Sequence, residues 1–390
     1  MPNLKFRDKS ITDKLTMLAF ALTGILVLLY IRYLLFYFQS GDYIMYTYPW
    51  ILEYQSMTFI EGLAARVGNY NHPYMYILNI IARFGNSGIF LIKAVSVFFD
   101  LLLAYFVMKI ISLKTESLNI RILAFFLIFA LPTVILNSSM WGQCDSIYAS
   151  FIVGSFYFAL RGRSKSAYAF LALAVSFKAQ AVFLLPVFPF LIINKKITLR
   201  DCYIFFIVYF STFIPALLAG RSFIEMLLTY IDQVGFYAAL NMNAINIWLF
   251  IENVNYERFS SVGMFATGFV ILGLMYFTWV NRVRLTGNLD YVRLAYLSAV
   301  IMPFLLPKMH DRYFFIADVL SVVLFIFDKR RWYVPVVTVS CSFLAYAAYL
   351  MWDTFVDLRL AVPALLFVII VVLKDYVTSL YPANTNCDHP

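Results

Sequence analysis

The 390-residue chain is too hydrophobic to be a soluble globular protein. Hydrophobic residues make up 63% of the sequence and charged residues only 13%, whereas about 25% of an average soluble domain is charged. We therefore expect an all-α polytopic membrane protein in which residues 1–390 form a single integral membrane domain.

A helix that crosses about 30 Å of hydrocarbon needs about 20 mostly apolar residues. The first apolar run is longer than the hydrophobic region of a signal peptide, which has about 7–15 residues, so we expect a retained helix. Several runs between 146 and 193 are short, and short or broken helices beside polar clusters are typical of a bundle that lines a cavity. The sequence predicts about twelve transmembrane helices, near 15–38, 87–111, 120–137, 146–160, 166–180, 181–193, 202–219, 261–280, 292–307, 313–328, 333–352 and 358–374.

The basic residues gather in alternate loops between these runs. Because Lys and Arg are enriched in cytoplasmic loops, we expect residues 1–14 and the tail 375–390 in the cytoplasm. The net charge of +9 is then a topology signal, and no nucleic-acid partner is expected. Twenty of the 30 basic residues follow this pattern: Lys5, Arg7, Lys9, Lys14, Lys109, Lys114, Arg121, Arg161, Arg163, Lys165, Lys195, Lys196, Arg200, Arg282, Arg284, Arg293, Lys329, Arg330, Arg331 and Lys374.

Two long loops are predicted on the opposite, non-cytoplasmic face, at 39–86 and 220–260. Each contains an amphipathic stretch, Tyr46–Tyr54 in the first and Phe223–Phe236 in the second. We expect both stretches to form helices along the membrane surface, where Tyr and Trp favour the headgroup region.

The first external loop offers two polar motifs. Asp42, just after the first span, is either the N-cap of the next helix or a general base close to the membrane. The motif Asn69-Tyr70-Asn71-His72-Pro73-Tyr74 suits a turn with Pro at the start of a helix. It equally suits carbohydrate, because Tyr rings cover sugar faces and amides bind hydroxyls. Asn71, His72 and Tyr74 are therefore candidate sugar or acceptor ligands.

Two further motifs lie at the same predicted membrane edge. In Trp141-Gly142-Gln143-Cys144-Asp145-Ser146, Asp145 or Ser146 would cap the next helix and Trp141 would fit an interfacial belt. However, Asn137, Gln143 and Asp145 provide more polar groups than a simple reversal needs. Lys178, close to Gln180, either extends its amine to the interface or binds a lipid phosphate.

The strongest functional signal is Lys308-Met309-His310-Asp311-Arg312-Tyr313. Three potential cations within five residues, on a face otherwise poor in positive charge, run against the usual distribution. Arg is well suited to bidentate phosphate recognition, so an anionic ligand is expected here. The four cysteines and three histidines have no metal-site spacing, and no metal or other cofactor is expected.

The chain resembles the polyprenyl-phosphate-dependent glycosyltransferases of the GT-C superfamily, especially bacterial proteins related to GPI-anchor mannosyltransferases. Three phrases carry the resemblance: Asn-Ser-Ser-Met-Trp-Gly-Gln-Cys-Asp-Ser at 137–146, Ser-Phe-Lys-Ala-Gln at 176–180 and Lys-Met-His-Asp-Arg-Tyr-Phe-Phe at 308–315. The resemblance implies an enzyme that uses a polyprenyl-phosphate-linked sugar on the non-cytoplasmic face. The family's first-loop acidic residue would be Asp42, a single Asp where many relatives have an Asp/Glu pair, which favours base catalysis over metal binding.

The resulting expectation is an inverting glycosyltransferase that transfers a sugar from a polyprenyl-phosphate donor to a glycan or glycolipid acceptor. A bacterial plasma membrane, with undecaprenyl phosphate as carrier, is favoured over an endoplasmic reticulum. The alternatives are a flippase of a lipid-linked saccharide, disfavoured by the lack of an internal repeat, and a membrane scaffold. The expected roles are base for Asp42, donor-phosphate binding for Lys178, Lys308, His310 and Arg312, and sugar or acceptor binding for Asn71, His72, Tyr74, Trp141, Gln143, Asp145, Gln180 and Tyr313.

Overall fold

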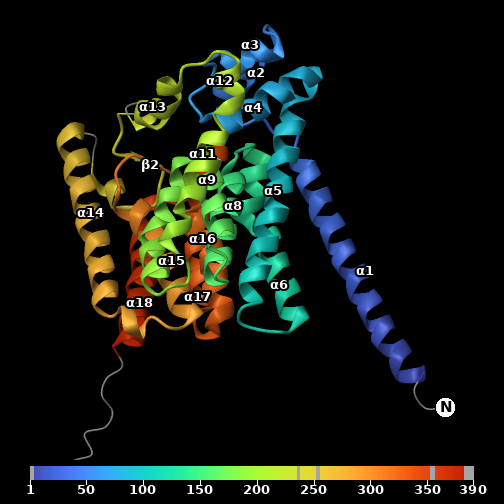
Figure 1. Ribbon diagram of the computed structural model, residues 1–390, viewed down its shortest axis with the longest axis vertical. Helices are drawn as coiled ribbons and strands as arrows, with labels where there is room; N and C mark the ends of the chain where they lie inside the picture. Colours follow the sequence, from blue (N-terminus) through green and yellow to red (C-terminus); the bar gives the residue numbers. More distant parts are fainter. Residues whose placement is uncertain (1–3, 235–237, 252–254, 352–355, 382–390) are drawn as a thin grey trace, which may run out of the picture.

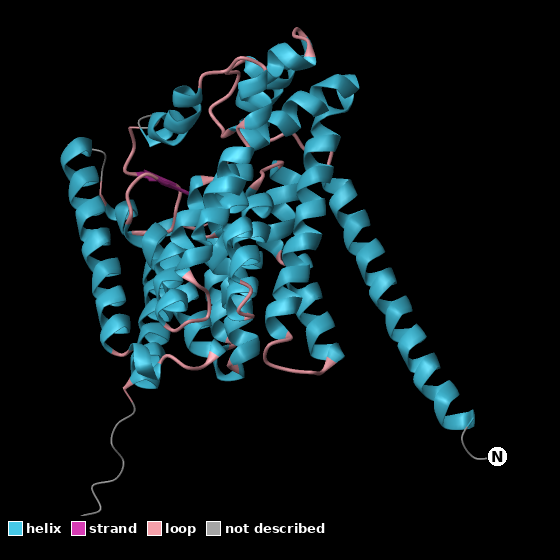
Figure 2. Ribbon diagram, in the orientation of Figure 1, coloured by secondary structure: helices cyan, strands magenta, loops and turns pink. Residues whose placement is uncertain are grey.

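The computed structural model describes residues 4–234, 238–251, 255–351 and 356–381. In this part of the chain the protein is all-α, with helices α1 to α18 and several short 3-10 and π-helical turns. A single pair of two-residue strands accompanies them (Figure 2). The expected all-α class is confirmed.

Five helical stretches among the described residues are long and apolar enough to cross a membrane. They lie in α1 (Leu4–Leu35), α5 (Gly88–Ile111), α14 (Tyr256–Val280), η8 (Lys329–Arg331) with α17 (Tyr333–Leu350), and η9 (Leu358–Ala361) with α18 (Val362–Leu380). A sixth would be the bent pair formed by α6 (Leu118–Phe129) and the segment Pro132–Trp141, which comprises α7 (Pro132–Ile135) and η3 (Leu136–Trp141). These helices support a membrane protein, and the total of about twelve spans stays a prediction.

The other apolar runs form shorter helices, and prolines interrupt some of them. Pro132 follows the end of α6, and the two parts of the bent pair meet at 50°. Pro186 lies inside a 3-10 segment, in keeping with the loss of one backbone donor at proline. The shorter elements are α8 (Asp145–Leu160), α9 (Ser164–Phe177), η4 (Ala179–Val187), α10 (Phe188–Ile193), η5 (Leu199–Cys202), α11 (Tyr203–Ser211), α12 (Ile214–Leu218), α15 (Asn288–Leu305) and α16 (Phe315–Phe327).

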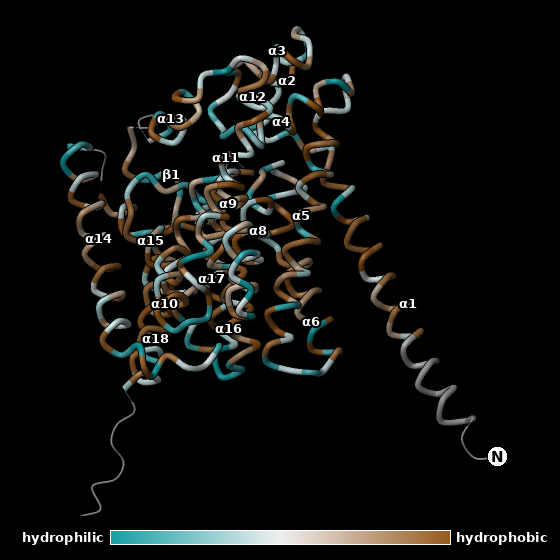
Figure 3. The backbone as a smooth tube through the Cα atoms, viewed as in Figure 1, coloured by the Kyte–Doolittle hydropathy of each residue, from teal (hydrophilic) through white to brown (hydrophobic). Residues whose placement is uncertain are grey.

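The core of the bundle is formed by α8, α15 and α16, whose residues are almost all buried. Helices α1 and α14 lie on opposite sides of this core (Figure 1). Residues 15–35 of α1 and most of α14 are hydrophobic (Figure 3), and both stretches keep many large apolar side chains exposed. A helix that is apolar all round without being buried by protein is what a bilayer accommodates.

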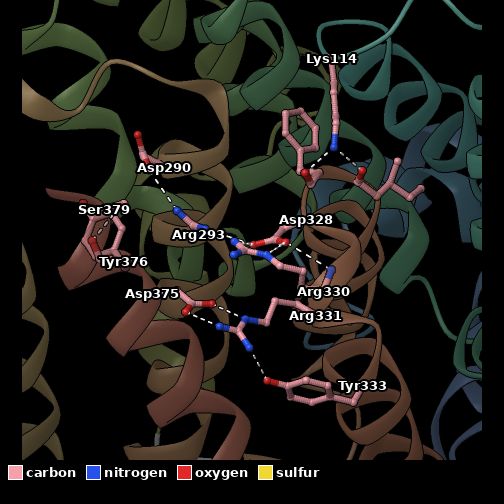
Figure 4. Close-up of polar contacts among 12 residues, drawn as sticks. Lys114, Asp290, Arg293, Asp328, Arg330, Arg331, Tyr333, Asp375, Tyr376 and Ser379 are labelled. Carbon is pink, nitrogen blue, oxygen red and sulfur yellow. Dashed lines mark hydrogen bonds and ion pairs between the residues drawn. The ribbon is translucent and has the colours of Figure 1, made fainter. Parts of the chain in front are cut away.

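The loops that carry the basic residues meet at one end of the bundle. Lys114 donates to the carbonyl oxygens of Ile326 and Phe327, so the turn after α5 contacts the end of α16. Nearby, Arg331 pairs with Asp375 of α18 at 2.5 Å (Figure 4). Further contacts join the remaining loops of this basic end: Arg293–Asp328, Asn194–Arg282, Arg284–Leu380 and Ser164–Thr198.

The opposite end carries a helical cap built from the two predicted external loops. The first loop contains η1 (Tyr43–Thr47), α2 (Tyr48–Gln55), α3 (Phe59–Ala64), α4 (His72–Ile81) and η2 (Ala82–Ser87). The second contains α13 (Phe223–Val234), β1 (Asn241–Met242) and η6 (Ile247–Phe250). Arg66 of the first loop pairs with Asp232 of the second at 2.6 Å, which joins the two loops above the bundle (Figure 1).

Both predicted amphipathic stretches are helical where the structure describes them. Tyr46–Tyr54 spans the end of η1 and most of α2, and Phe223–Phe236 coincides with α13 up to Val234, with its last two residues outside the described part. Strand β1 pairs in parallel with β2 (Met309–His310), with Asn241 opposite Met309 and Met242 opposite His310. This pairing fixes the His310 segment beneath the cap.

Candidate functional site

A polar cavity of about 910 Å³, including its open part, lies between the cap and the end of the bundle. Its wall combines charged groups, amides and aromatic rings from segments far apart in the sequence. Eight of the predicted site residues belong to this wall: Asp42, Tyr74, Gln143, Lys178, Gln180, His310, Arg312 and Tyr313. The other lining residues are Tyr46, Thr47, Trp50, Asn69, Tyr70, Gly142, Phe177, Tyr230 and Gln233.

Asp42 lies at the cavity wall with its carboxylate held by three hydrogen-bond donors. Trp141 Nε1 donates to Oδ2 at 3.0 Å, Gln143 Nε2 donates to Oδ2 at 2.6 Å, and the Tyr349 hydroxyl donates to Oδ1 at 2.7 Å. The side chain remains 21% exposed, so it stays accessible from the cavity. Asp42 precedes η1 but makes no side-chain capping bond, so the structure does not support the helix-cap interpretation.

Arg312 is surrounded by carboxylates. Its Nη1 lies 3.4 Å from Asp42 and 3.7 Å from Asp311, and its Nε lies 3.8 Å from Asp145. The guanidinium also lies 5.3 Å from the centre of the Trp141 ring. The chain therefore supplies anionic partners for Arg312, and the cation does not need a ligand to balance its charge. The expectation that Arg312 also binds an external anion stays a prediction.

Lys178, in the wall, forms a buried ion pair with Asp145, which lies behind the wall. Lys178 Nζ contacts Asp145 Oδ1, and Asn137 Nδ2 donates to Asp145 Oδ2 at 2.8 Å. Neither Asp145 nor Ser146 caps α8: the residue at the N-cap is Cys144, and it makes no side-chain capping bond. The capping interpretation of this motif is therefore wrong.

Two neighbouring groups of the 308–313 motif have strongly shifted pKa values. Burial, followed by the charges of Arg312 and Lys178, lowers the pKa of His310 well below its usual value. The lowered pKa favours the neutral form of His310 at pH 7. Burial raises the pKa of Asp311 to about 7, although the Arg312 guanidinium acts in the opposite direction.

A second cavity of about 880 Å³ adjoins the first one and is more apolar. The two share a wall formed by Gln180, Tyr230, Gln233, His310 and Tyr313. Lys308 belongs to this second cavity, and not to the first, with its amine 5.0 Å from the centre of the Tyr256 ring. The other lining residues are Ala179, Val182, Phe183, Met242, Met264, Leu306, Pro307 and Met309.

Four predicted residues do not line either cavity. Trp141 and Asp145 lie directly behind the wall and contact Asp42 and Lys178 respectively. Asn71 is the N-cap of α4, where its side chain accepts from the backbone N–H of His72 at 3.0 Å. The ring of His72 is buried, with its centre 4.5 Å from that of Phe213. Burial lowers the pKa of His72 to about 3. Asn71 and His72 are therefore structural in this chain.

Besides the other lining residues, three residues that contact predicted site residues were not themselves predicted: Asp311, Tyr70 and Tyr349. Asp311 accepts the Arg312 backbone N–H at 2.9 Å. Its place in the 308–313 motif was the sequence signal that could have identified it. Tyr70, which lines the cavity, also belongs to a predicted motif and donates to Gln143 Oε1 at 3.3 Å. Tyr349 lies at the end of an apolar span, and no local feature of the sequence distinguishes it.

Among the described residues, no group of three or more His, Cys, Asp or Glu side chains is arranged to hold an ion. No protein-family model matches the chain, and no curated protein sequence matches it significantly.

Proposed function

We propose that the protein is an inverting glycosyltransferase that uses a polyprenyl-phosphate-linked sugar as donor, as its resemblance to the GT-C superfamily implies. One observation carries the proposal. The accessible carboxylate of Asp42 and the cations Arg312 and Lys178 face one polar cavity beside a cavity with an apolar lining. This combination suits a substrate with a sugar, a phosphate and a hydrocarbon chain.

In the proposed reaction, Asp42 removes the proton from the acceptor hydroxyl, as a general base does. The acceptor oxygen attacks the anomeric carbon from the face opposite the phosphate, a new C–O bond forms, and the bond to the phosphate oxygen breaks with inversion. The donors Trp141, Gln143 and Tyr349 keep the carboxylate oriented. Polyprenyl phosphate leaves with both electrons of the broken bond, and the proton on Asp42 passes to water.

The charges around Arg312 suit this reaction better than simple phosphate binding. Three carboxylates (Asp42, Asp145 and Asp311) surround Arg312 and Lys178, so a donor phosphate must share the two cations with them. Binding is then modest for the singly charged donor and strengthens as the leaving phosphate gains its second negative charge. Interactions that strengthen towards the transition state are the ones that accelerate a reaction.

The remaining wall residues would bind the sugar and the lipid. Tyr70 and Tyr74, whose ring centres are 5.0 Å apart, present aromatic faces next to the amides of Gln143 and Gln180. The second cavity, with Met242, Met264 and Leu306, would take the first isoprene units, and Lys308 and neutral His310 would contact the phosphate from that side. No metal is required in this scheme.

The two ends of the bundle support an active site on the non-cytoplasmic face. The basic loops lie at one end and the cavity at the other, and positively charged loops face the cytoplasm in most membrane proteins. We propose a bacterial plasma membrane, undecaprenyl phosphate as lipid carrier, and a glycan or glycolipid as acceptor.

A transfer assay in detergent tests the proposal. Purified protein is incubated with radiolabelled polyprenyl-phosphate sugars and a lipid extract, and the expected result is label in a new product that Asp42→Asn does not form. A flippase could move lipids only between compartments, so transfer in detergent separates the two functions. If no sugar is transferred while labelled lipid crosses reconstituted vesicle membranes, the flippase replaces the enzyme. Mass analysis of lipid-linked glycans from a deletion strain would identify the sugar and the acceptor.

A further inference from the structure

The chain enters the candidate site from α1, a helix that the bundle hardly covers. Only 6% of its apolar stretch is buried, and it diverges from the other helices towards its N-terminus (Figure 1). Asp42 lies only seven residues beyond its last residue, Leu35. Packing along α1 therefore does little to fix the position of Asp42, and other contacts must do so.

Lys93 of α5 provides the first of these contacts. Its side chain is buried, and Nζ donates to the carbonyl oxygens of Leu35 at 3.1 Å, Phe36 at 3.0 Å and Phe38 at 2.6 Å. The last carbonyl groups of a helix lack intrahelical partners, and a lysine can satisfy them. One buried amine thus fixes the chain at the end of α1.

Asp100 of α5 provides the second contact. It lies two helical turns after Lys93, so both side chains extend from the same face of α5. Asp100 accepts from Arg32 Nη2 at 3.2 Å, from the Ser138 hydroxyl at 2.6 Å and from the Ser146 hydroxyl. Arg32 also donates to the Phe129 carbonyl at 2.6 Å, and its guanidinium lies 4.0 Å from the centre of that ring.

These contacts link three of the segments that supply the site: α1 leads to Asp42, η3 contains Trp141, and α8 begins with Asp145. Between α1 and Asp42, the Ser40 hydroxyl donates to the Trp141 carbonyl at 2.8 Å, which continues the connection. We infer that Lys93 and Asp100 are positioning residues that hold Asp42 against Trp141 and Gln143. The inference rests on the proposed function, in which Asp42 is the base.

The main test separates positioning from stability by comparing single and double substitutions of the buried pair Arg32–Asp100. Arg32→Met or Asp100→Asn alone leaves an incomplete buried pair and should lower the thermal midpoint by roughly 5–10 °C. The double variant Arg32→Met/Asp100→Asn removes both charges and keeps an acceptor for Ser138 and Ser146. Its midpoint should return to within roughly 2 °C of the wild type, whereas turnover should stay at least about tenfold lower with donor KM nearly unchanged.

A reporter that needs no substrate follows the segment directly. Ser40 is 2% exposed, so Ser40→Cys, in a protein whose four native cysteines are replaced, should react very slowly with a hydrophilic maleimide. In the stable double variant the thiol should react at least about tenfold faster. A buried thiol reacts only while its segment is open, so the labelling rate increases with how often the segment opens. Labelling as slow as in the parent, together with wild-type turnover, would show that Arg32 and Asp100 only stabilise the fold.

Lys93→Met offers a second test with a matched control. Lys114 makes the same kind of contact at the basic end, to the carbonyls of Ile326 and Phe327. The control is Lys114→Met. Both substitutions should lower the thermal midpoint, but only Lys93→Met should accelerate labelling of Ser40→Cys and lower turnover. Equal effects of the two variants on labelling would overturn the inference. If instead Asp42→Asn keeps full turnover, the proposed base is wrong, whereas the labelling results still decide whether Lys93 and Asp100 hold this segment.

Discussion

Asp42 is the one carboxylate of the site with a substantial part of its side chain exposed, at 21%, compared with 1% for Asp145 and 4% for Asp311. Asp42→Asn keeps the shape of the side chain but removes its ability to take up the acceptor proton. Turnover should fall by about 10²–10⁴, the usual contribution of a positioned base. The measurement is sugar transfer by purified protein at saturating donor.

The control for this substitution is Glu53→Gln, which neutralises an exposed carboxylate of the same loop, outside the residues that line the cavity. It should leave turnover within about twofold of the wild type, because an exposed charge away from the reacting atoms contributes little. If Asp42→Asn were as active as Glu53→Gln, the reaction would need another base.

Arg312 has a planar group that reaches Asp42 and Asp145 at the same time. Arg312→Lys keeps the charge but cannot span both carboxylates, so donor recognition should weaken by about tenfold or more, and Arg312→Ala should weaken it further. Inhibition by free polyprenyl phosphate should decrease in the same order. Arg66→Lys, at an exposed pair with Asp232, is the matched control and should change neither quantity; undiminished inhibition of Arg312→Ala would place the phosphate elsewhere.

Asp311 should make stability depend on pH. Its pKa is about 7 in the folded protein and 3.8 in its ordinary state, so folding favours the protonated form. The stabilisation is complete below about pH 4 and is lost as the pH rises towards 7, with a total change of about 4 kcal/mol. Asp311→Asn keeps an acceptor for the Arg312 backbone N–H and removes this dependence.

The measurement is the difference between the thermal midpoints of Asp311→Asn and wild type at several pH values. His72 and His310 have lowered pKa values, so each destabilises the folded protein as the pH falls below about 6.5. Both histidines are present in both proteins, and their contributions cancel in the difference. The difference should grow from pH 5 to 7 in favour of Asp311→Asn and stay constant above. A difference that does not vary with pH would contradict the raised pKa.

At the level of elements, long apolar runs were predictable and interrupted ones were not. Helices α5 and α17 lie within two residues of the predicted spans 87–111 and 333–352. The predicted span 120–137 instead bends by 50° at Pro132, because proline removes a backbone donor and clashes with the preceding turn. The β1–β2 pairing joins residues 68 positions apart, and strands of two residues leave no alternating pattern to recognise.

The candidate site was predictable as far as it lies in motifs at one end of the spans. Gln143, Lys178 and Arg312 meet in one wall because each follows or precedes a helix end at that face. Asn71 and His72 are also polar residues at this face, but Asn71 caps α4 and the His72 ring packs against Phe213. The orientation of His72 depends on Phe213, a residue distant in sequence, and local patterns carry no information about it. The cap at Asn71, in contrast, fits the predicted turn with Pro at the start of a helix.

Helix α14 packs against Trp248 and Pro307 through Gly263, and this close approach gives an element-level prediction. A Cβ at Gly263 would collide with the Trp248 ring and lie 3.0 Å from Pro307 Cδ. Because Trp248 is held by a hydrogen bond to the Leu305 carbonyl at 2.7 Å, Gly263→Ala should push α14 outwards and destabilise the protein by about 1–3 kcal/mol. Donor KM should rise, since Met264 and Pro307 line the cavity.

Gly268 of the same helix has nothing within 4 Å of its added Cβ. Gly268→Ala is therefore the matched control, and it should be neutral or stabilise by up to about 1 kcal/mol through helix propensity. Thermal midpoints and donor KM of both variants are the measurements. Equal midpoints for the two variants would mean that α14 does not pack on Trp248 through Gly263.

In the whole molecule, the cavity and the basic loops occupy opposite ends, so one membrane orientation fixes both. With the basic end in the cytoplasm, Ile60 of α3 should face the outside, and Leu199 and Val283 should face the cytoplasm. All three side chains are exposed, at 61%, 62% and 82%. As single cysteines in a cysteine-free protein, only Ile60→Cys should react with an impermeant maleimide on intact cells, and the other two should react after permeabilisation. Labelling of Val283→Cys on intact cells, with Ile60→Cys protected, would place the site in the cytoplasm and exclude a donor presented on the outer face.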